Sequence, residues 1–542
     1  MSFPIQAFTP QTLWDIWPES RFETIAAPCF RHSQLMESLQ RLASRHPADL
    51  RVQEVGQSVL GRPIQLVTLG NGDKKILLWS QMHGDEPSAT PALLDIANYL
   101  LENADDPVTR SILDQYTLLM IPMLNPDGAE VYERYNAQGI DINRDALHLV
   151  TPEGRLLKRI RDEYEPMLGF NLHDQDLRTA VGDTGQVAVN ALQSVSGDAA
   201  NTLTSGRKRT RRACAAIVEA LAPFFPGGMA RYDEGWSPRA FGDNITAWGT
   251  PVVLIESGGV PAGHDLTDLT RTNFVAILMV LKGLAEDDLE SYDPQVYESL
   301  NRNRSSSWSD VMVTGGSILQ PGASAAYRAD LAFDIFRSDR QLAACADEGR
   351  VPSRIFLLGD GEFHGAGTRV DASGSVLLPS FDVGVEGWQG GQWLDTKSLT
   401  RLARLGVGTI YWAVDKAQQQ AAIDVAGQHD NRGLPHINVL NDPSGLPQIV
   451  LTEPPQPVTS FSWLATLDAL GVKRPTEAGS TGQLWMKAAE HRVGSARLRK
   501  TQAASFLIVK PAPDGQINDS RAEIVSIWLD GQQVAPEKPV IK

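Results

Sequence analysis

KKILLWSQMHGDE, residues 74–86, is a strongly apolar run that ends in a histidine and two acids. Its first part, 74–82, has the length and apolar character of a buried strand. The segment that follows, 87–102, starts with Pro87 and carries leucine and alanine along one face, which is typical of a helix packed on a sheet. We therefore expect a strand and then a helix, with His83 and Glu86 between them.

Similar apolar runs recur along the chain at 116–124, 170–172 and 251–257. Between about 50 and 285 they alternate with longer helical patterns. This alternation predicts an α/β fold with a mixed, mostly parallel sheet flanked by helices. In such sheets ligands gather at strand ends, so polar residues that directly follow these runs are candidate site residues.

The apolar periodicity stops at 300–310, where small and polar residues take over. Beyond it, short β-rich pieces are separated by Gly, Pro and Asp turns, a pattern typical of a β-sandwich. We therefore expect a first domain over 1–298, a linker over 299–308 and a β-sandwich-like domain over 309–542.

The chain has 542 residues and a formal charge of -16, from 49 Lys and Arg against 65 Asp and Glu. This acidic balance opposes binding to nucleic acid or to anionic membranes. The first residues show no signal-peptide pattern, and no later segment is apolar enough to span a bilayer, so we expect a cytoplasmic protein. The composition is compatible with a homo-oligomer.

His83 and Glu86 are spaced by three residues, so both side chains can face one point across a first helical turn. A catalytic zinc ion usually takes three protein ligands and keeps one position for water. His173, at the end of the run 170–172, is a candidate for the third ligand. The alternatives are a solvated pair at a helix start and a structural histidine that caps a loop.

A polar stretch at 125–145 carries Arg134, Asn143 and Arg144. Arginine matches a carboxylate with a fork of donors, and asparagine adds a neutral donor, so this stretch suits a substrate carboxylate. The alternative is a solvated loop. Glu256 ends an otherwise apolar strand, where a carboxylate is costly unless it is functional or paired with a neighbouring arginine.

On these residues, the region from about 50 to 285 resembles the zinc metallocarboxypeptidases of the carboxypeptidase A type. HGDE is similar to the HxxE zinc motif of that family, and RYNAQGIDINRD is similar to its substrate-binding stretch. The resemblance implies one zinc ion per chain, Zn²⁺ held by His83, Glu86 and His173. It also makes Glu256 the general base that activates a zinc-bound water.

The resemblance further implies that Arg134 stabilises the developing oxyanion, while Asn143 and Arg144 hold the terminal carboxylate of the substrate. The tyrosine that lies over the substrate pocket in the family is less clear in this chain. Tyr232 is the candidate, and Trp236 and Phe241 compete for that position.

The stretch 237–244 contains both Arg239 and Asp243, which would select opposite charges at the last side chain of the substrate. The preferred C-terminal residue therefore stays open.

Residues about 309–390 and 490–535 resemble the small β-sandwich of amidohydrolases. Gly384 and Glu386 stand where that family has metal-binding histidines. Only about 100 residues separate the two halves of the sandwich, too few for a barrel of eight βα units. We expect a sandwich without a hydrolase centre, with His364, His429 and His436 as loop or surface residues.

The sequence thus predicts a hydrolase that removes a C-terminal amino acid from a peptide with a free carboxylate. One alternative is a zinc-dependent deacylase of N-acyl amino acids, which would use the same ligands. Another is a catalytically silent binding or scaffold protein, although that would require a lost ligand or base. The most specific part of the prediction is the set His83, Glu86, His173 and Glu256.

Overall fold

The computed structural model describes residues 8–22, 30–232, 235–320, 325–334 and 353–386, with shorter pieces at 407–413, 436–441, 447–450, 494–495, 498, 500, 504–511, 513, 523–529 and 532–535. The chain divides into two compact units, the first running through Trp308 and the second beginning at Ser309. Each unit has its own core. Within the described residues, no helix combines the length and the apolar composition that crossing a membrane requires.

The first unit is built on an eight-stranded sheet in the order β1-β2-β4-β3-β5-β9-β7-β8. The four strands β4, β3, β5 and β9 are parallel neighbours, and β7 and β8 are also parallel, whereas β1, β2 and β7 make the antiparallel pairings. This confirms the mixed, mostly parallel sheet. The strands are β1 (Leu50–Gln57), β2 (Pro63–Leu69), β3 (Lys74–Ser80), β4 (Tyr116–Ile121), β5 (Leu168–Asp174), β7 (Asn190–Ser194), β8 (Met229–Arg231) and β9 (Val252–Ser257).

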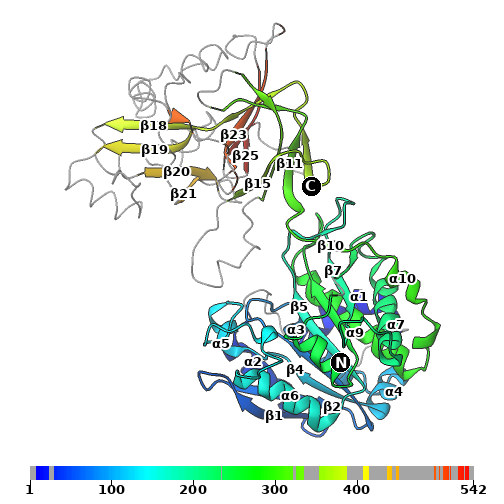
Figure 1. Ribbon diagram of the computed structural model, residues 1–542. Helices are drawn as coiled ribbons and strands as arrows, with labels where there is room; N and C mark the ends of the chain where they lie inside the picture. The colour runs from blue at the N-terminus through cyan, green and yellow to red at the C-terminus, as the bar shows by residue number, and fades with distance from the viewer. Residues whose placement is uncertain are drawn as a thin grey trace. The chain divides into compact units, whose positions relative to one another are not determined.

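Helices cover both faces of this sheet (Figure 1). Ile76 and Leu78 of β3 pack in a core with residues of α3, α7 and α9, while Leu77 and Trp79 pack on the other face with α6 and α8. Burial on both faces explains why the strand is a continuous apolar run. The helices are α1 (Pro10–Ser20), α2 (His32–Arg45), α3 (Ala89–Glu102), α4 (Pro107–Gln115), α5 (Pro126–Val131), α6 (Pro152–Tyr164), α7 (Ser205–Leu221), α8 (Phe241–Ala247), α9 (Thr267–Ala285) and α10 (Pro294–Glu298), with 3-10 turns η1 (Ile142–Arg144) and η2 (Leu289–Ser291).

The segment predicted as a linker, 299–308, contains the short strand β10 (Asn303–Arg304), which pairs with β6 (Ala180–Val181). The expected helix over 87–102 starts two residues later, as α3 begins at Ala89. The strands around the candidate site residues lie where the apolar runs predicted them.

In the second unit, a four-stranded sheet, β15-β14-β11-β16, and a six-stranded sheet, β13-β12-β17-β23-β24-β25, contribute to one hydrophobic core. Phe333 of β14 packs on Phe506 of β23 and Trp528 of β24, the arrangement of a β-sandwich. The strands are β11 (Trp308–Thr314), β12 (Ser317–Ile318), β13 (Tyr327–Arg328), β14 (Asp330–Asp334), β15 (Arg354–Gly359), β16 (Gly365–Asp371), β17 (Val376–Pro379), β23 (Phe506–Lys510), β24 (Glu523–Leu529) and β25 (Gln532–Ala535).

A third sheet, β21-β20-β19-β18-β22, follows the first half of the sandwich. Gly384 and Glu386 lie on its strand β18 (Phe381–Glu386), which runs parallel to β19 (Val407–Ala413). His364 lies in the turn before β16, where it is buried and its Nε2 contacts the Ser309 hydroxyl at 2.9 Å. His436 begins β20 (His436–Asn441), and His429 lies outside the described residues. The other strands are β21 (Pro447–Val450) and β22 (Gly494–Ser495).

Candidate metal centre

Three neighbouring parallel strands bring the candidate metal and catalytic residues to one edge of the sheet. His83 and Glu86 lie in the loop between β3 and α3, His173 is on β5, and Glu256 is on β9. His173 and Glu256 are direct partners in the parallel register of β5 and β9. All four side chains are buried. The fold therefore gathers residues that are up to 173 positions apart in the chain, as the carboxyl ends of parallel strands do.

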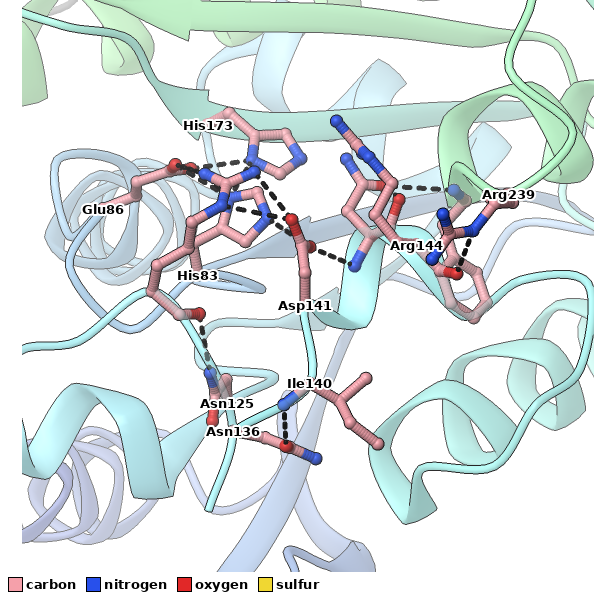
Figure 2. Close-up of polar contacts among 12 residues, drawn as sticks. His83, Glu86, Asn125, Asn136, Ile140, Asp141, Arg144, His173 and Arg239 are labelled. Carbon is pink, nitrogen blue, oxygen red and sulfur yellow. Dashed lines mark hydrogen bonds and ion pairs between the residues drawn. The ribbon is translucent and has the colours of Figure 1, made fainter. Parts of the chain in front are cut away.

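His83, Glu86 and His173 converge on one point (Figure 2). His83 Nδ1 lies 2.7 Å from Glu86 Oε1, and His173 Nδ1 lies 2.7 Å from Glu86 Oε2. The two Nδ1 atoms are 3.1 Å apart. Two imidazole nitrogens and a carboxylate that face one another this closely form a donor set that zinc accepts.

Asp141 orients the imidazole of His83, a role that the sequence did not predict. Asp141 Oδ1 lies 3.0 Å from His83 Nε2, so a proton on Nε2 is donated to the carboxylate and Nδ1 faces the other ligands. A carboxylate behind a histidine ligand is a common support of metal sites. The one signal in the sequence was an acid two positions before Asn143, separated from it by Ile142.

The charges of the cluster stabilise one another. Burial lowers the pKa of His83, but the adjacent Glu86 carboxylate and the bond to Asp141 outweigh it and raise the pKa to about 9. Burial alone would raise the pKa of Glu86, yet the two histidines hold it below its usual range. The pKa of His173 is lowered, mainly by burial. The carboxylate of Glu86 is therefore held in its charged form.

Arg134 joins the ligands to Asp141. Its Nη1 donates to Glu86 Oε1 at 3.0 Å, and its Nε and Nη2 donate to Asp141 Oδ2 at 3.1 and 3.0 Å. The Arg134 side chain is about one-third exposed. A fixed, partly solvated cation beside the ligand cluster can stabilise negative charge that develops on a substrate.

Glu256 faces the cluster without a hydrogen-bond or ion-pair partner among the described residues. Burial, followed by the negative charge of Glu86, raises the pKa of its carboxyl well above the usual range. The sequence left open an ion pair between Glu256 and a neighbouring arginine. Arg134 pairs with Glu86 and Asp141 and not with Glu256. A desolvated carboxylate at this position is suited to accept a proton.

Asn143 and Arg144 lie in η1, and Figure 2 shows Arg144 on the side of Asp141 away from Glu86. Asn143 Oδ1 accepts a hydrogen bond from the Phe241 backbone amide at 2.8 Å, which orients the side-chain amide. Arg144 is exposed, and its Nη1 donates to the Asn143 carbonyl at 2.7 Å. Arg239 donates to the Arg144 carbonyl at 3.2 Å. The two predicted carboxylate-binding residues are thus held by α8 and the segment before it.

Tyr232, the candidate for the tyrosine over the substrate pocket, lies within electrostatic reach of Glu256. The negative charge of Glu256, followed by burial, raises its pKa to about 12. Of its two competitors, Trp236 is exposed and Phe241 is fully buried in the core. Asp243 is also buried, accepts a hydrogen bond from the Ser237 amide at 2.7 Å, and has its pKa raised to about 6, mainly by burial.

Two further carboxylates flank the ligands in sequence, Asp85 and Asp174. Each has one buried oxygen without a hydrogen-bond partner. Asp174 also accepts from the Ser88 amide at 3.0 Å, and burial together with Glu86 raises its pKa to about 8. Sequence reasoning did not select them, because acids beside a ligand are common in polar loops.

The zinc carboxypeptidase family model matches residues 35–165. This match confirms the resemblance that the sequence motifs predict. The matched segment contains His83, Glu86, Arg134, Asn143 and Arg144 but ends before the third ligand and the candidate base. His173 and Glu256, which lie beyond the match, are brought together by the pairing of β5 and β9.

Two curated relatives are similar to part of this chain. Carboxypeptidase SOL1 of Arabidopsis thaliana is 30% identical over 121 residues, which cover 21% of this chain and 25% of that protein. Gamma-D-glutamyl-L-diamino acid endopeptidase 1 of Lysinibacillus sphaericus is 32% identical over 108 residues, 19% of this chain and 27% of that protein. The chain thus spans about a quarter of the length of these curated relatives.

Among solved structures, a metallo-carboxypeptidase from Burkholderia cenocepacia is similar at 19% identity with a TM-score of 0.38, over 47% of this chain and 68% of that one. A metallo-carboxypeptidase from Pseudomonas aeruginosa is similar at 21% identity with a TM-score of 0.37, over 47% and 69%.

Proposed function

Because residues 35–165 match the zinc carboxypeptidase family, we propose that the chain is a zinc-dependent metallocarboxypeptidase that hydrolyses the C-terminal peptide bond of its substrate. The observation that carries the proposal is the convergence of His83, Glu86 and His173, with Glu256 as the strand partner of His173 and without a bond partner in the part of the chain that the structure describes. A structural site would need a fourth protein ligand, and a silent binding protein would have no use for a buried base at this position.

In this mechanism, His83 Nδ1, His173 Nδ1 and the Glu86 carboxylate hold the ion, and Asp141 keeps the His83 ring in place. When bound, zinc polarises a carbonyl and lowers the pKa of its water towards about 7. Glu256 takes the proton from the attacking water and passes it to the leaving amine. Its buried position makes the carboxylate a stronger base than an exposed one.

Arg134 and the pair Asn143 and Arg144 bind the substrate. The Arg134 guanidinium stabilises the oxyanion that develops on the scissile carbonyl. Arg144, exposed beside the oriented amide of Asn143, binds the free carboxylate through charge-assisted hydrogen bonds. A site that reads this carboxylate releases one C-terminal residue at a time.

The experiment that tests the function combines metal analysis of the full chain with a substrate panel. We expect one zinc per chain and turnover of peptides with a free C-terminus. Matched C-terminal amides and N-acyl amino acids belong in the same panel. Preference for the N-acyl amino acids would favour the deacylase, and a chain that binds no zinc and turns over none of these substrates would refute the proposal.

Glu256→Gln separates catalysis from structure at the same site. The substitution keeps size and hydrogen-bonding reach but cannot take a proton, and a general base typically contributes about 10²–10⁴-fold. We expect zinc content to stay unchanged while peptide turnover falls by that order. A variant that is less stable but fully active would show that Glu256 serves only the fold.

A further inference from the structure

Gln81 combines a buried polar side chain with a left-handed backbone. Its φ angle is 49°, and the residue is inaccessible to solvent. A residue with a side chain is strained in this region and persists there only where its surroundings over-determine it. Glycine or asparagine would adopt the conformation more readily. The contacts around Gln81 must therefore offset this strain.

The side-chain amide of Gln81 closes the turn that carries two metal ligands. Its Nε2 donates to the carbonyl of Gly84 at 3.0 Å, and Gly84 directly follows His83. Its Oε1 lies 2.9 Å from the Thr90 hydroxyl, which also lies 2.7 Å from the Pro122 carbonyl, and Thr90 lies in the first turn of α3. One amide thus joins the loop between His83 and Glu86 to the helix that follows it.

The backbone around Gln81 is fixed as well. The carbonyl of Gln81 accepts from the amide of Asn125, the N-cap of α5, at 3.0 Å. The loop also packs tightly on α5, since a Cβ on Gly84 would lie 2.0 Å from the carbonyl carbon of Gly128. The loop is thus held against α5, and the Gln81 amide supplies the connection to α3.

We propose that Gln81 is a positioning residue for the metal centre. Its left-handed backbone turns the chain out of β3, and its amide fixes the loop so that His83 and Glu86 face His173. This inference rests on the proposed zinc site and concerns metal affinity, not the hydrolytic step. The competing explanation is that Gln81 stabilises the core and has no effect on metal binding.

Two substitutions in the full chain test the proposal. Gln81→Gly removes both amide bonds but relieves the left-handed strain, and Gln81→Glu keeps the size and the acceptor for Thr90 while placing an oxygen opposite the Gly84 carbonyl. Residues that support metal ligands typically contribute roughly tenfold to a hundredfold to metal affinity. We expect the zinc dissociation constant, measured by competition with a chelator, to rise at least tenfold in both variants.

Glu165→Gly is the matched control. Glu165 also has a positive φ, 44°, but it is exposed at the end of α6. Its replacement relieves the same kind of strain and should leave zinc affinity unchanged. The melting temperature of each metal-free variant is recorded in parallel, because a purely structural role would lower it without changing zinc affinity.

Thr90→Val tests the same connection if the Gln81 variants do not fold. It preserves the shape of the side chain, removes the hydroxyl that contacts Gln81, Pro122 and Ser80, and should weaken zinc binding severalfold. Wild-type affinity in the folded Gln81 variants, or in Thr90→Val when those do not fold, would overturn the inference. If the wild-type chain itself bound no zinc, the proposed function would fail instead, so the two failures are distinct.

Discussion

Replacing Asp141 should weaken metal binding by an amount that follows from its hydrogen bonds. The carboxylate contacts His83 Nε2 at 3.0 Å and accepts from Arg134 at 3.0 and 3.1 Å. Its side chain is only 15% exposed, so these bonds are partly desolvated. Hydrogen bonds to a charged group contribute about 1.5–3 kcal/mol, against about 0.5–1.5 kcal/mol for neutral ones.

Two substitutions separate the contribution of the negative charge of Asp141 from that of the hydrogen-bond acceptor. Asp141→Asn keeps an acceptor for His83 but removes the charge, a difference of about 1–1.5 kcal/mol or roughly tenfold in the zinc dissociation constant. Asp141→Ala removes the acceptor, which should weaken binding roughly tenfold to a hundredfold. The expected order of affinity is therefore wild type, then asparagine, then alanine.

The assay is zinc competition with a chelator, together with the melting temperature of the metal-free protein. Asp127→Asn is the control, because Asp127 is a buried carboxylate with bonds to Arg62, Ser58 and the Leu60 amide. It should lower stability and leave zinc affinity near that of the wild type. Wild-type affinity in a folded Asp141→Ala variant would refute the assigned role of Asp141.

Two further predictions concern residues beside the ligands. Arg144→Gln should reduce the preference for a peptide over its C-terminal amide by tenfold or more in kcat/KM, because the contact between the arginine and the substrate carboxylate is lost. An unchanged ratio of the two kcat/KM values would exclude Arg144 as the carboxylate-binding residue. Burial raises the folded-state pKa of Asp243 to about 6 from an unfolded value near 3.8, so the folded state favours the neutral form. Stability should therefore fall as pH rises from about 4 to 6. The melting temperature of Asp243→Asn should not show this fall. The same pH dependence of melting temperature in wild type and variant would contradict the prediction.

The central strands could be predicted because burial on both faces makes them continuous apolar runs. The run that ends before His83 became β3, and the run over 251–257, which carries Glu256, became β9. The parallel alignment of such strands then brings the residues at their ends together. The position of the candidate site was thus accessible from the sequence.

The supporting residues could not be predicted in this way. Asp141 is one acid among many in a polar stretch, and only the folded loop places it 3.0 Å from His83. Gln81 gave no signal at all, because neither its positive φ nor its bonds to Gly84 and Thr90 follow from residue type. Contacts between side chains of different loops depend on the tertiary structure, whereas strand positions follow from local periodicity.

The same distinction holds in the second unit. Short apolar pieces between turn residues predicted the strands that form the shared core around Phe333 and Phe506. The parallel pairing of β18 with β19 was not predicted, since strand partners depend on the connection between them and not on the strand itself.

The parallel register of β5 and β9 makes His173 and Glu256 direct neighbours across a single strand spacing, about 4.8 Å. A slip of one residue would turn one of these side chains to the opposite face of the sheet. Glu256 would then lie on the face of the sheet opposite His173. A chain that refolds with β9 in the wrong register should therefore lose turnover even if all three proposed zinc ligands are in place. The ratio of activity to bound zinc after refolding would therefore report on the alignment of β5 and β9. This measurement does not require a spectroscopic label on the sheet.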